Sequence, residues 1–246
     1  MSHLRTNWPA RLMWTSLTII VFALRPCLSS SQADDIAVSD RDGVTSIQCD
    51  GRPLLEYRSQ PNPMKVYVSK WFTPQGTQVL RDSPHDHVHH HALMFAIGID
   101  NCDFWSEVPA QDYGKQVPAS EASVAASSSN GHGQVVIKQA INWVNTRSEV
   151  LAVESREITA HQGAVHAASL LTWASTLTPT EAKPEVELWG RHYFGLGMRF
   201  LESMDTGVAF VTPGDEPGTV VRGSEKLTRA TWCALHAKAD GKPVTM

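Results

Sequence analysis

The sequence predicts an all-β fold, an antiparallel β-sandwich, and three observations favour it. The 246 residues have the composition of a globular protein, with 42% hydrophobic and 19% charged residues. After the first thirty-odd residues, no apolar pattern keeps a helical spacing over three turns. Short runs rich in Val, Ile, Tyr, Trp and Thr recur instead, interrupted by turn residues, as is typical of sandwiches and barrels.

The N-terminal segment has the pattern of an export signal. Arg5 and Arg11 precede the apolar run 12–24, which is shorter than the ~20 residues of a membrane-spanning helix. Ser31-x-Ala33 is a small-residue cleavage site that follows this run. We therefore expect residues 1–33 to be a signal peptide and the mature protein to be periplasmic or extracellular. No stable membrane insertion is expected after cleavage.

The first predicted strands after this segment form a hairpin. Residues 44–49 and 53–57 flank Asp50-Gly51, a dipeptide that favours tight turns. Residues 91–99 are almost continuously apolar, as expected of a central strand covered on both faces. Residues 135–143 alternate between apolar and polar side chains, as a half-buried strand does. Further strands are predicted over 64–72, 149–159, 165–177, 185–190, 194–201 and 231–239.

One domain, residues 34–246, is the simplest organisation of these strands. The Ser/Ala/Gly-rich stretch 119–133 has no periodicity and is predicted to be a flexible surface loop. The net charge of −4 provides no basic surface for a nucleic acid. Cys49, Cys102 and Cys233 would remain after cleavage; two can form a disulfide, or all three can be buried thiols.

A histidine-rich segment is the strongest indication of a functional site. Five of the eleven histidines lie between residues 85 and 91, directly after Arg81 and Asp82. Where this segment is extended, His87, His89 and His91 share one face and His90 lies on the other. Imidazoles act as acids, bases or ligand-binding groups near neutral pH. The alternative is that these histidines only bond to backbone and water.

The same segment permits a metal site. Two imidazoles in an H-x-H pair, His87 and His89, can bind one divalent transition metal ion. A third ligand must then come from elsewhere in the chain, and the candidates are His192, Glu107, Asp82 and Asp86. Neither a cupin-type Glu after the pair nor an H-E-x-x-H motif is present.

A second cluster, residues 189–200, combines aromatic residues, His192 and Arg199 with three glycines. Such glycines indicate a backbone that closely approaches something, or a glycine bulge in an aromatic core. Trp105, in the sequence Asp-Phe-Trp, presents the same choice. An exposed Trp105 or Trp189 would be a stacking platform for a sugar ring, whereas a buried one would be core.

Six short motifs occur along the chain: T-P-x-G-T at 73–77, R-D-x-P at 81–84, D-H-x-H-H at 86–90, D-F-W at 103–105, G-L-G-M-R-F at 195–200 and D-G-K-P-V at 240–244. Together they resemble a bacterial family of unknown function that is commonly labelled "methane oxygenase PmoA". The resemblance implies an exported β-sandwich related to galactose-mutarotase-like folds, in a carbohydrate context. The family's usual H-H-R-G is replaced here by His-His-His91-Ala. Its members also continue past D-G-K-P-V, so we expect this chain to be a truncated member.

The leading functional hypothesis is a carbohydrate-related enzyme that uses acid–base chemistry on a sugar or sugar derivative. His87, His90 and His192 would be catalytic, and Arg81, Asp82, His91, Trp105 and Arg199 would bind the saccharide or other small molecule. One rival is a metal-dependent oxygenase or lyase with His87 and His89 as ligands. The others are a non-catalytic carbohydrate-binding module and an inactive truncated family member.

Overall fold

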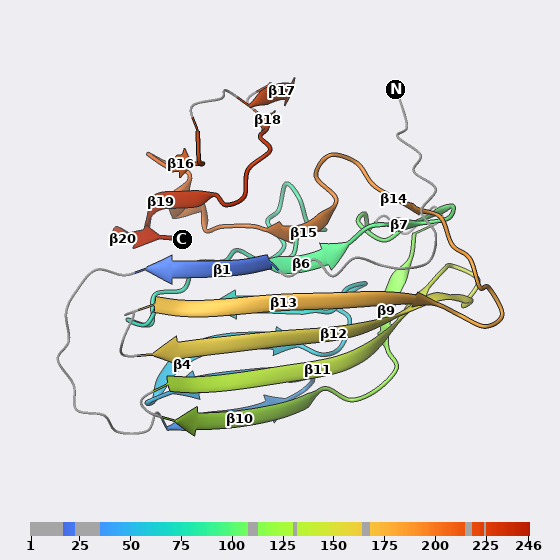
Figure 1. The fold of residues 1–246 in the computed structure, drawn as a ribbon, viewed down its shortest axis with the longest axis horizontal. Helices are drawn as coiled ribbons and strands as arrows, with labels where there is room; N and C mark the ends of the chain where they lie inside the picture. Colours follow the sequence, from blue (N-terminus) through green and yellow to red (C-terminus); the bar gives the residue numbers. More distant parts are fainter. Residues whose placement is uncertain are drawn as a thin grey trace.

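The chain folds almost entirely into β-strands. The computed structural model describes residues 17–22, 35–107, 113–129, 132–163, 168–214, 218–223 and 225–246. In these residues the only helical element is one 3₁₀ turn, η1 (Glu202–Met204). All strand pairs of the sheets are antiparallel (Figure 1), which confirms the predicted all-β sandwich-like class. None of the described segments is a helix with the length and apolarity needed to cross a membrane.

The larger sheet has the order β10-β11-β12-β13-β1-β20-β19-β16, with β9 also paired to β11. Its longest strands lie side by side in Figure 1, and β11 alternates buried and less buried residues, as its apolar/polar sequence predicts. Its strands are β1 (Leu17–Phe22), β9 (Lys115–Pro118), β10 (Ser123–Ser129), β11 (His132–Val144), β12 (Val150–Gly163), β13 (Ala168–Pro179), β16 (Ala209–Val211), β19 (Ala234–Ala239) and β20 (Lys242–Thr245).

The second sheet, in the order β15-β6-β5-β4-β3-β2, contains the predicted hairpin. Asp50 and Gly51 both have positive φ, 50° and 69°, at the turn between β3 and β4, a conformation that Asp and Gly tolerate. The strands are β2 (Ile36–Arg41), β3 (Val44–Cys49), β4 (Arg52–Arg58), β5 (Tyr67–Trp71), β6 (Leu93–Ala96) and β15 (Gly195–Met198).

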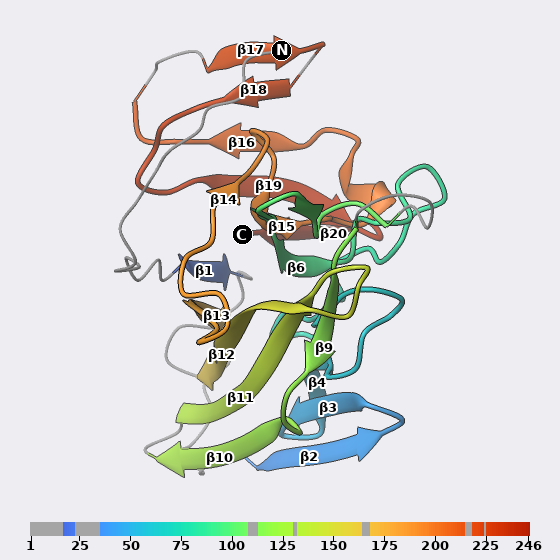
Figure 2. The ribbon, with the colours of Figure 1, turned by 90° about the vertical axis from the view of Figure 1, so that its right-hand side faces the viewer.

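Two small sheets complete the described fold. One, in the order β14-β7-β8, consists of β7 (Gly98–Ile99), β8 (Cys102–Asp103) and β14 (Leu188–Trp189). The other pairs β17 (Thr219–Arg222) with β18 (Glu225–Leu227) and lies above β16 in Figure 2.

The core lies between the two large sheets, which form the layers seen in Figure 1. A polar cluster crosses this core. Glu154 accepts two hydrogen bonds from the guanidinium of Arg156, at 2.8 Å each, and Arg156 also donates to the carbonyl of Val66. Tyr57 of β4 donates to Gln139 of β11. Buried charged groups are tolerated where they are paired and hydrogen-bonded in this way.

Several element boundaries differ from the prediction. Part of the Ser-rich stretch predicted to be a loop is a strand, because residues 123–129 form β10 and pair with β11. The continuous strand predicted over 91–99 is divided into β6 and β7. The strand predicted over 185–190 shrinks to Leu188–Trp189. Of the cysteines, Cys49 and Cys102 are buried and Cys233 is exposed.

The N-terminal apolar run is not wholly separate from the fold. Its residues Leu17–Phe22 form β1, which pairs with β13 over six residues. The predicted cleavage site at Ala33 lies outside the described residues, as do residues 1–16 and 23–34. Cleavage and export of the chain stay predictions from the sequence.

Candidate functional site: a histidine loop above a buried charge network

The histidine-rich segment joins β5 to β6 as a loop with two tight turns. Its two ends are fixed at Arg199, whose carbonyl accepts from the N–H of Arg81 and whose N–H donates to Ala92. Inside the loop, His87 N–H donates to the carbonyl of Pro84, and His90 N–H donates to the carbonyl of His87. The segment is therefore not extended here, because these turn hydrogen bonds reverse the chain twice, and the alternation of faces expected for an extended chain does not apply.

The turns gather three imidazoles that an extended strand would have separated. The ring centroids of His87 and His90 are 4.8 Å apart and stacked, and those of His89 and His90 are 4.4 Å apart, edge to face. Burial, followed by the neighbouring His89, lowers the pKa of His90 to about 4. Burial and then Lys65 also lower the pKa of His89. Both rings are thus neutral at neutral pH.

His91, the next residue, points into the protein instead. Its side chain is buried between two carboxylates, with Nδ1 2.8 Å from Asp82 and Nε2 2.9 Å from Glu107. Its ring stacks on Tyr67 at a centroid distance of 4.3 Å. Burial lowers the pKa of His91, but the hydrogen bonds to Asp82 and Glu107 raise it more, so the net pKa is raised. Both ring nitrogens of His91 thus face carboxylates, an arrangement that favours the imidazolium form.

Lys65 and Tyr67 complete a network beneath the loop. The Lys65 ammonium lies 2.7 Å from Glu107 and donates to the backbone carbonyl of His89. The Tyr67 hydroxyl donates to Asp82 at 2.8 Å. Two cations, Lys65 and His91, thereby balance the two carboxylates. We name Lys65, Tyr67, Asp82, His91 and Glu107 the charge network.

The aromatic cluster lies against the histidine loop through Trp105. The ring of Trp105 is 5.6 Å from His90 and stacks on Phe194 at 5.2 Å. Trp105 is only 5% exposed. A Cβ on Gly197 would approach its ring to 3.1 Å. Trp105 is therefore not a free stacking platform for a sugar ring, because Phe194 covers one face and the backbone at Gly197 is close.

The second proposed platform, Trp189, is also a packing residue. Its indole N–H donates to the carbonyl of Asp100 at 2.6 Å. A Cβ on Gly98 would lie 2.0 Å from its ring, which is why glycine is required there. The aromatic-core interpretation thus holds for both tryptophans. Within the part of the chain that the structure describes, the buried Nε1 of Trp105 has no hydrogen-bond partner.

The remaining predicted residues divide between the site and its surroundings. Arg199 lies 3.8 Å from Asp86, whose carboxylate is 3.0 Å from His87 Nδ1, so both belong to the rim of the histidine loop. Arg81 is paired instead with Glu202. His192 is exposed, with contacts to Glu225 and Tyr193. The structure therefore does not place His192 beside His87 and His90.

The metal interpretation lacks a third ligand in this arrangement. In the part of the chain that the structure describes, no three His, Cys, Asp or Glu side chains are placed to hold a metal ion. Among the candidates, Glu107 is bound to Lys65 and His91, and Asp82 to His91 and Tyr67.

Sequence reasoning missed Lys65 and Tyr67, although a signal was present. Residues 65, 67, 69 and 71 share one face of an extended chain, and Tyr67 and Trp71 mark that face as buried. A lysine in phase with them predicts a buried ammonium, which requires a carboxylate partner.

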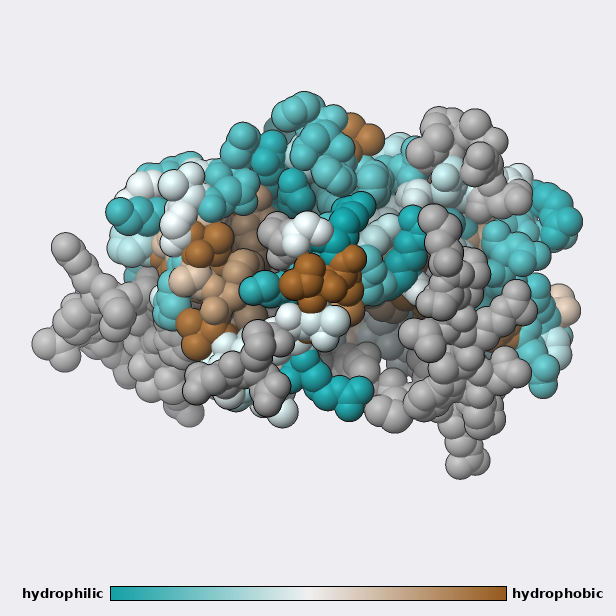
Figure 3. Space-filling model, turned by 90° about the horizontal axis from the view of Figure 1, so that it is seen from above, coloured by the Kyte–Doolittle hydropathy of each residue, from teal (hydrophilic) through white to brown (hydrophobic). Residues whose placement is uncertain are grey.

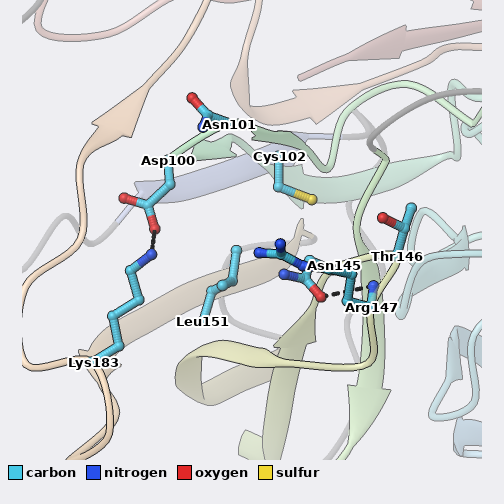
Figure 4. Close-up of a pocket in the computed structure, with 8 residues that line it drawn as sticks. All are labelled: Asp100, Asn101, Cys102, Asn145, Thr146, Arg147, Leu151 and Lys183. Carbon is cyan, nitrogen blue, oxygen red and sulfur yellow. Dashed lines mark hydrogen bonds and ion pairs between the residues drawn. The ribbon is translucent and has the colours of Figure 1, made fainter.

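A hollow of about 240 Å³ lies elsewhere, near the turn between β11 and β12 (Figure 4). Its two cations are already neutralised, since Lys183 is 2.5 Å from Asp100 and Arg147 is 2.9 Å from Glu149. This hollow contains none of the residues that the sequence singled out as functional, and its cations are not available to a ligand.

Comparison with known proteins gives one match. The family model described as "Family of unknown function (DUF6807)" matches residues 44–246. No curated protein and no solved structure matches the chain. The match agrees with the expected family of unknown function, and its description names no activity.

Proposed function

The chain belongs to DUF6807, a family of unknown function, and from that premise we propose that its histidine loop binds a neutral, polyhydroxylated ligand, a saccharide. The observation that carries the proposal is the group of packed imidazoles, His87, His89 and His90, two of them with lowered pKa values. A neutral imidazole has one N–H donor and one acceptor nitrogen. A sugar hydroxyl likewise both donates and accepts.

The charges at the rim favour an uncharged ligand. Arg199 and Asp86 are oppositely charged and 3.8 Å apart. The charge network beneath is balanced, with His91 and Lys65 against Asp82 and Glu107. An anionic ligand would therefore find no unpaired cation in the loop, whereas a hydroxyl-rich ligand requires none.

The charge network supports the loop as a rigid base. Lys65 holds the carbonyl of His89, and His91 is fixed at both ring nitrogens. Fixed supporting residues keep binding groups at the required geometry. The same neutral His90 can accept a proton from a bound hydroxyl, which is the first step of acid–base chemistry on a sugar. An exported protein, as the N-terminal pattern predicts, would meet such saccharides outside the cytoplasm.

A saccharide screen with matched histidine variants tests the proposal. We expect mono- and oligosaccharides to raise the melting temperature of the wild-type protein. His90→Ala should weaken binding by about tenfold or more, the equivalent of a lost hydrogen bond or two. His236→Ala is the control, because His236 is an exposed histidine of β19 that bonds to Thr245. Equal saccharide binding by folded His90→Ala would contradict the proposal.

The metal-dependent alternative is separated by the same samples. If the metal-dependent alternative is right, mass spectrometry will find near one equivalent of a transition metal in the wild-type protein, and this metal will be absent from His87→Ala. Saccharide binding that persists after chelation, in contrast, favours the metal-free site proposed above.

A further inference from the structure

The position of β1 in the larger sheet is not explained by the histidine loop. Figure 1 shows β1 beside β13, on the side toward the C-terminal strands. It pairs with β13 from Leu17↔Trp173 to Phe22↔Ala168, and with β20 at Phe22↔Thr245. β1 alone joins β13 to β20 in the described sheet order.

This strand lies outside the part of the chain that defines the family. The family match begins at residue 44, whereas both neighbours of β1, β13 and β20, lie within residues 44–246. In the described sheet, the position between β13 and β20 is therefore filled by a strand from outside the matched residues.

The edge of β13 is built for a partner strand. Ser169 and Leu171 are fully buried, and Trp173 is 3% exposed. In an antiparallel ladder, the N–H and C=O groups of β13 that do not face β12 need a partner on the other side. Buried backbone groups without partners are costly. Without β1, this segment of β13 would be an open sheet edge.

One buried side chain at this edge lacks a hydrogen-bond partner. The hydroxyl of Ser169 is buried and unpaired. In the backbone register of β1, the residue opposite Ser169 is Val21. A Thr at that position of an incoming strand can supply the missing bond, as cross-strand hydroxyl pairs do.

From these contacts we infer that the edge between β13 and β20 is a strand-accepting site for an extended, apolar, β-branched peptide. The segment Leu-Thr-Ile-Ile-Val-Phe of β1 has this composition and shows the register of binding. Addition of a strand to a sheet edge is an established mode of peptide recognition, in which main-chain bonds supply the affinity. In a chain cut after Ala33, β1 is lost and a partner's strand takes this position.

The test uses the full chain with a protease site inserted between residues 28 and 29. After cleavage, we expect the N-terminal fragment to co-elute with the remainder and to be displaced by excess fluorescent peptide with the β1 sequence, as measured by anisotropy. A peptide with prolines in place of Ile19 and Ile20 should bind at least tenfold more weakly, because proline removes ladder donors. A peptide carrying Val21→Thr should bind several-fold more tightly.

Two results would overturn the inference. One is equal binding of the proline peptide, which indicates apolar adhesion without strand pairing. The other is release of the fragment with no peptide binding, while circular dichroism of the remainder is unchanged. If cleavage unfolds the chain, the inference can be tested by amide hydrogen exchange on the uncleaved Ile20→Pro variant. Amides of residues 169–173 should then exchange faster than in the wild type, and equal exchange rates would refute the site.

A second surface, the exposed apolar side chains of the C-terminal segment, supports no inference of this kind. These are Phe210, Val211, Val220, Val221, Leu227 and Trp232. Figure 3 views the side on which these C-terminal elements lie, and it shows brown areas among teal and white ones. Nothing in the described residues identifies what would cover them.

Discussion

His90 and His91 are consecutive in the sequence, but their pKa values shift in opposite directions. Both lose solvent on folding, which lowers the pKa of each. His90 meets two other histidines and Trp105, and burial lowers its pKa to about 4. His91 meets two carboxylates, and its net pKa is raised. Burial alone therefore does not determine the protonation of a histidine; the charge of its partners does.

The two environments have different roles. In the proposed function, the neutral rings of His89 and His90 offer donors and acceptors to a ligand at the surface of the loop. The charged His91 is used internally, to hold Asp82 and Glu107 in place. The experiments below test this division, in order of the size of the expected effect.

Removal of one carboxylate from the charge network should have the largest effect. Glu107→Gln leaves the buried Lys65 and His91 without their shared partner, and should lower the free energy of unfolding by about 3–5 kcal/mol, as expected for a broken buried pair. Urea denaturation measures the change. Glu56→Gln is the matched control, because Glu56–Lys70 is a more exposed pair whose loss should cost at most about 1 kcal/mol. Equal losses in both variants would refute the network's structural role.

Replacement of His91 by a permanent cation should change the pH dependence of stability more than stability itself. The pKa of His91 is higher in the folded state than its unfolded value of about 6.5. The contribution of His91 to the free energy of unfolding is therefore fully present below pH 6.5, and it is lost as the pH rises through the folded pKa. His91→Arg keeps a cation between the carboxylates without this titration. The melting temperature of the wild type should thus fall relative to that of His91→Arg above pH 6.5. Parallel curves would contradict a charged His91.

Direct titration of the two rings is the finest test, since it changes no residue. In NMR spectra recorded from pH 3.5 to 8.5, the His90 ring should titrate near pH 4 and the His91 ring above its ordinary value. His90→Ala and His91→Arg assign the two signals. A reversed order would invert the roles assigned to these residues.

The features of the site that could be predicted are those that depend on residues close together in the sequence. The density of histidines between residues 85 and 91 singled out this segment without any structure. In the structure, Trp105 lies beside His90 and Arg199 beside Asp86, whereas the ligand-binding roles predicted for them stay predictions. The roles of individual histidines were not predictable. The alternation of an extended chain paired His91 with His87 and His89, whereas turn hydrogen bonds at Pro84 and His87 reversed the chain and turned His91 inward.

The fold also divides into features that local chemistry predicts and features that depend on distant residues. The turn at Asp50-Gly51 and the alternation of β11 depend on local chemistry, and both were predicted. The Ser-rich strand β10 was not, because small polar residues carry no period and become a strand only when β11 offers its edge.

The sequence by itself determined the β class, the turn positions, the family and the histidine-rich segment, because these depend on neighbours along the chain. Only the tertiary structure decided the different surroundings of His90 and His91, since Glu107 reaches His91 from a distant part of the chain and Lys65 in turn reaches Glu107. It likewise decided that Leu17–Phe22 lies beside β13. Charge balance in a buried site and the pairing of strand edges are long-range properties, which no local pattern of residues specifies.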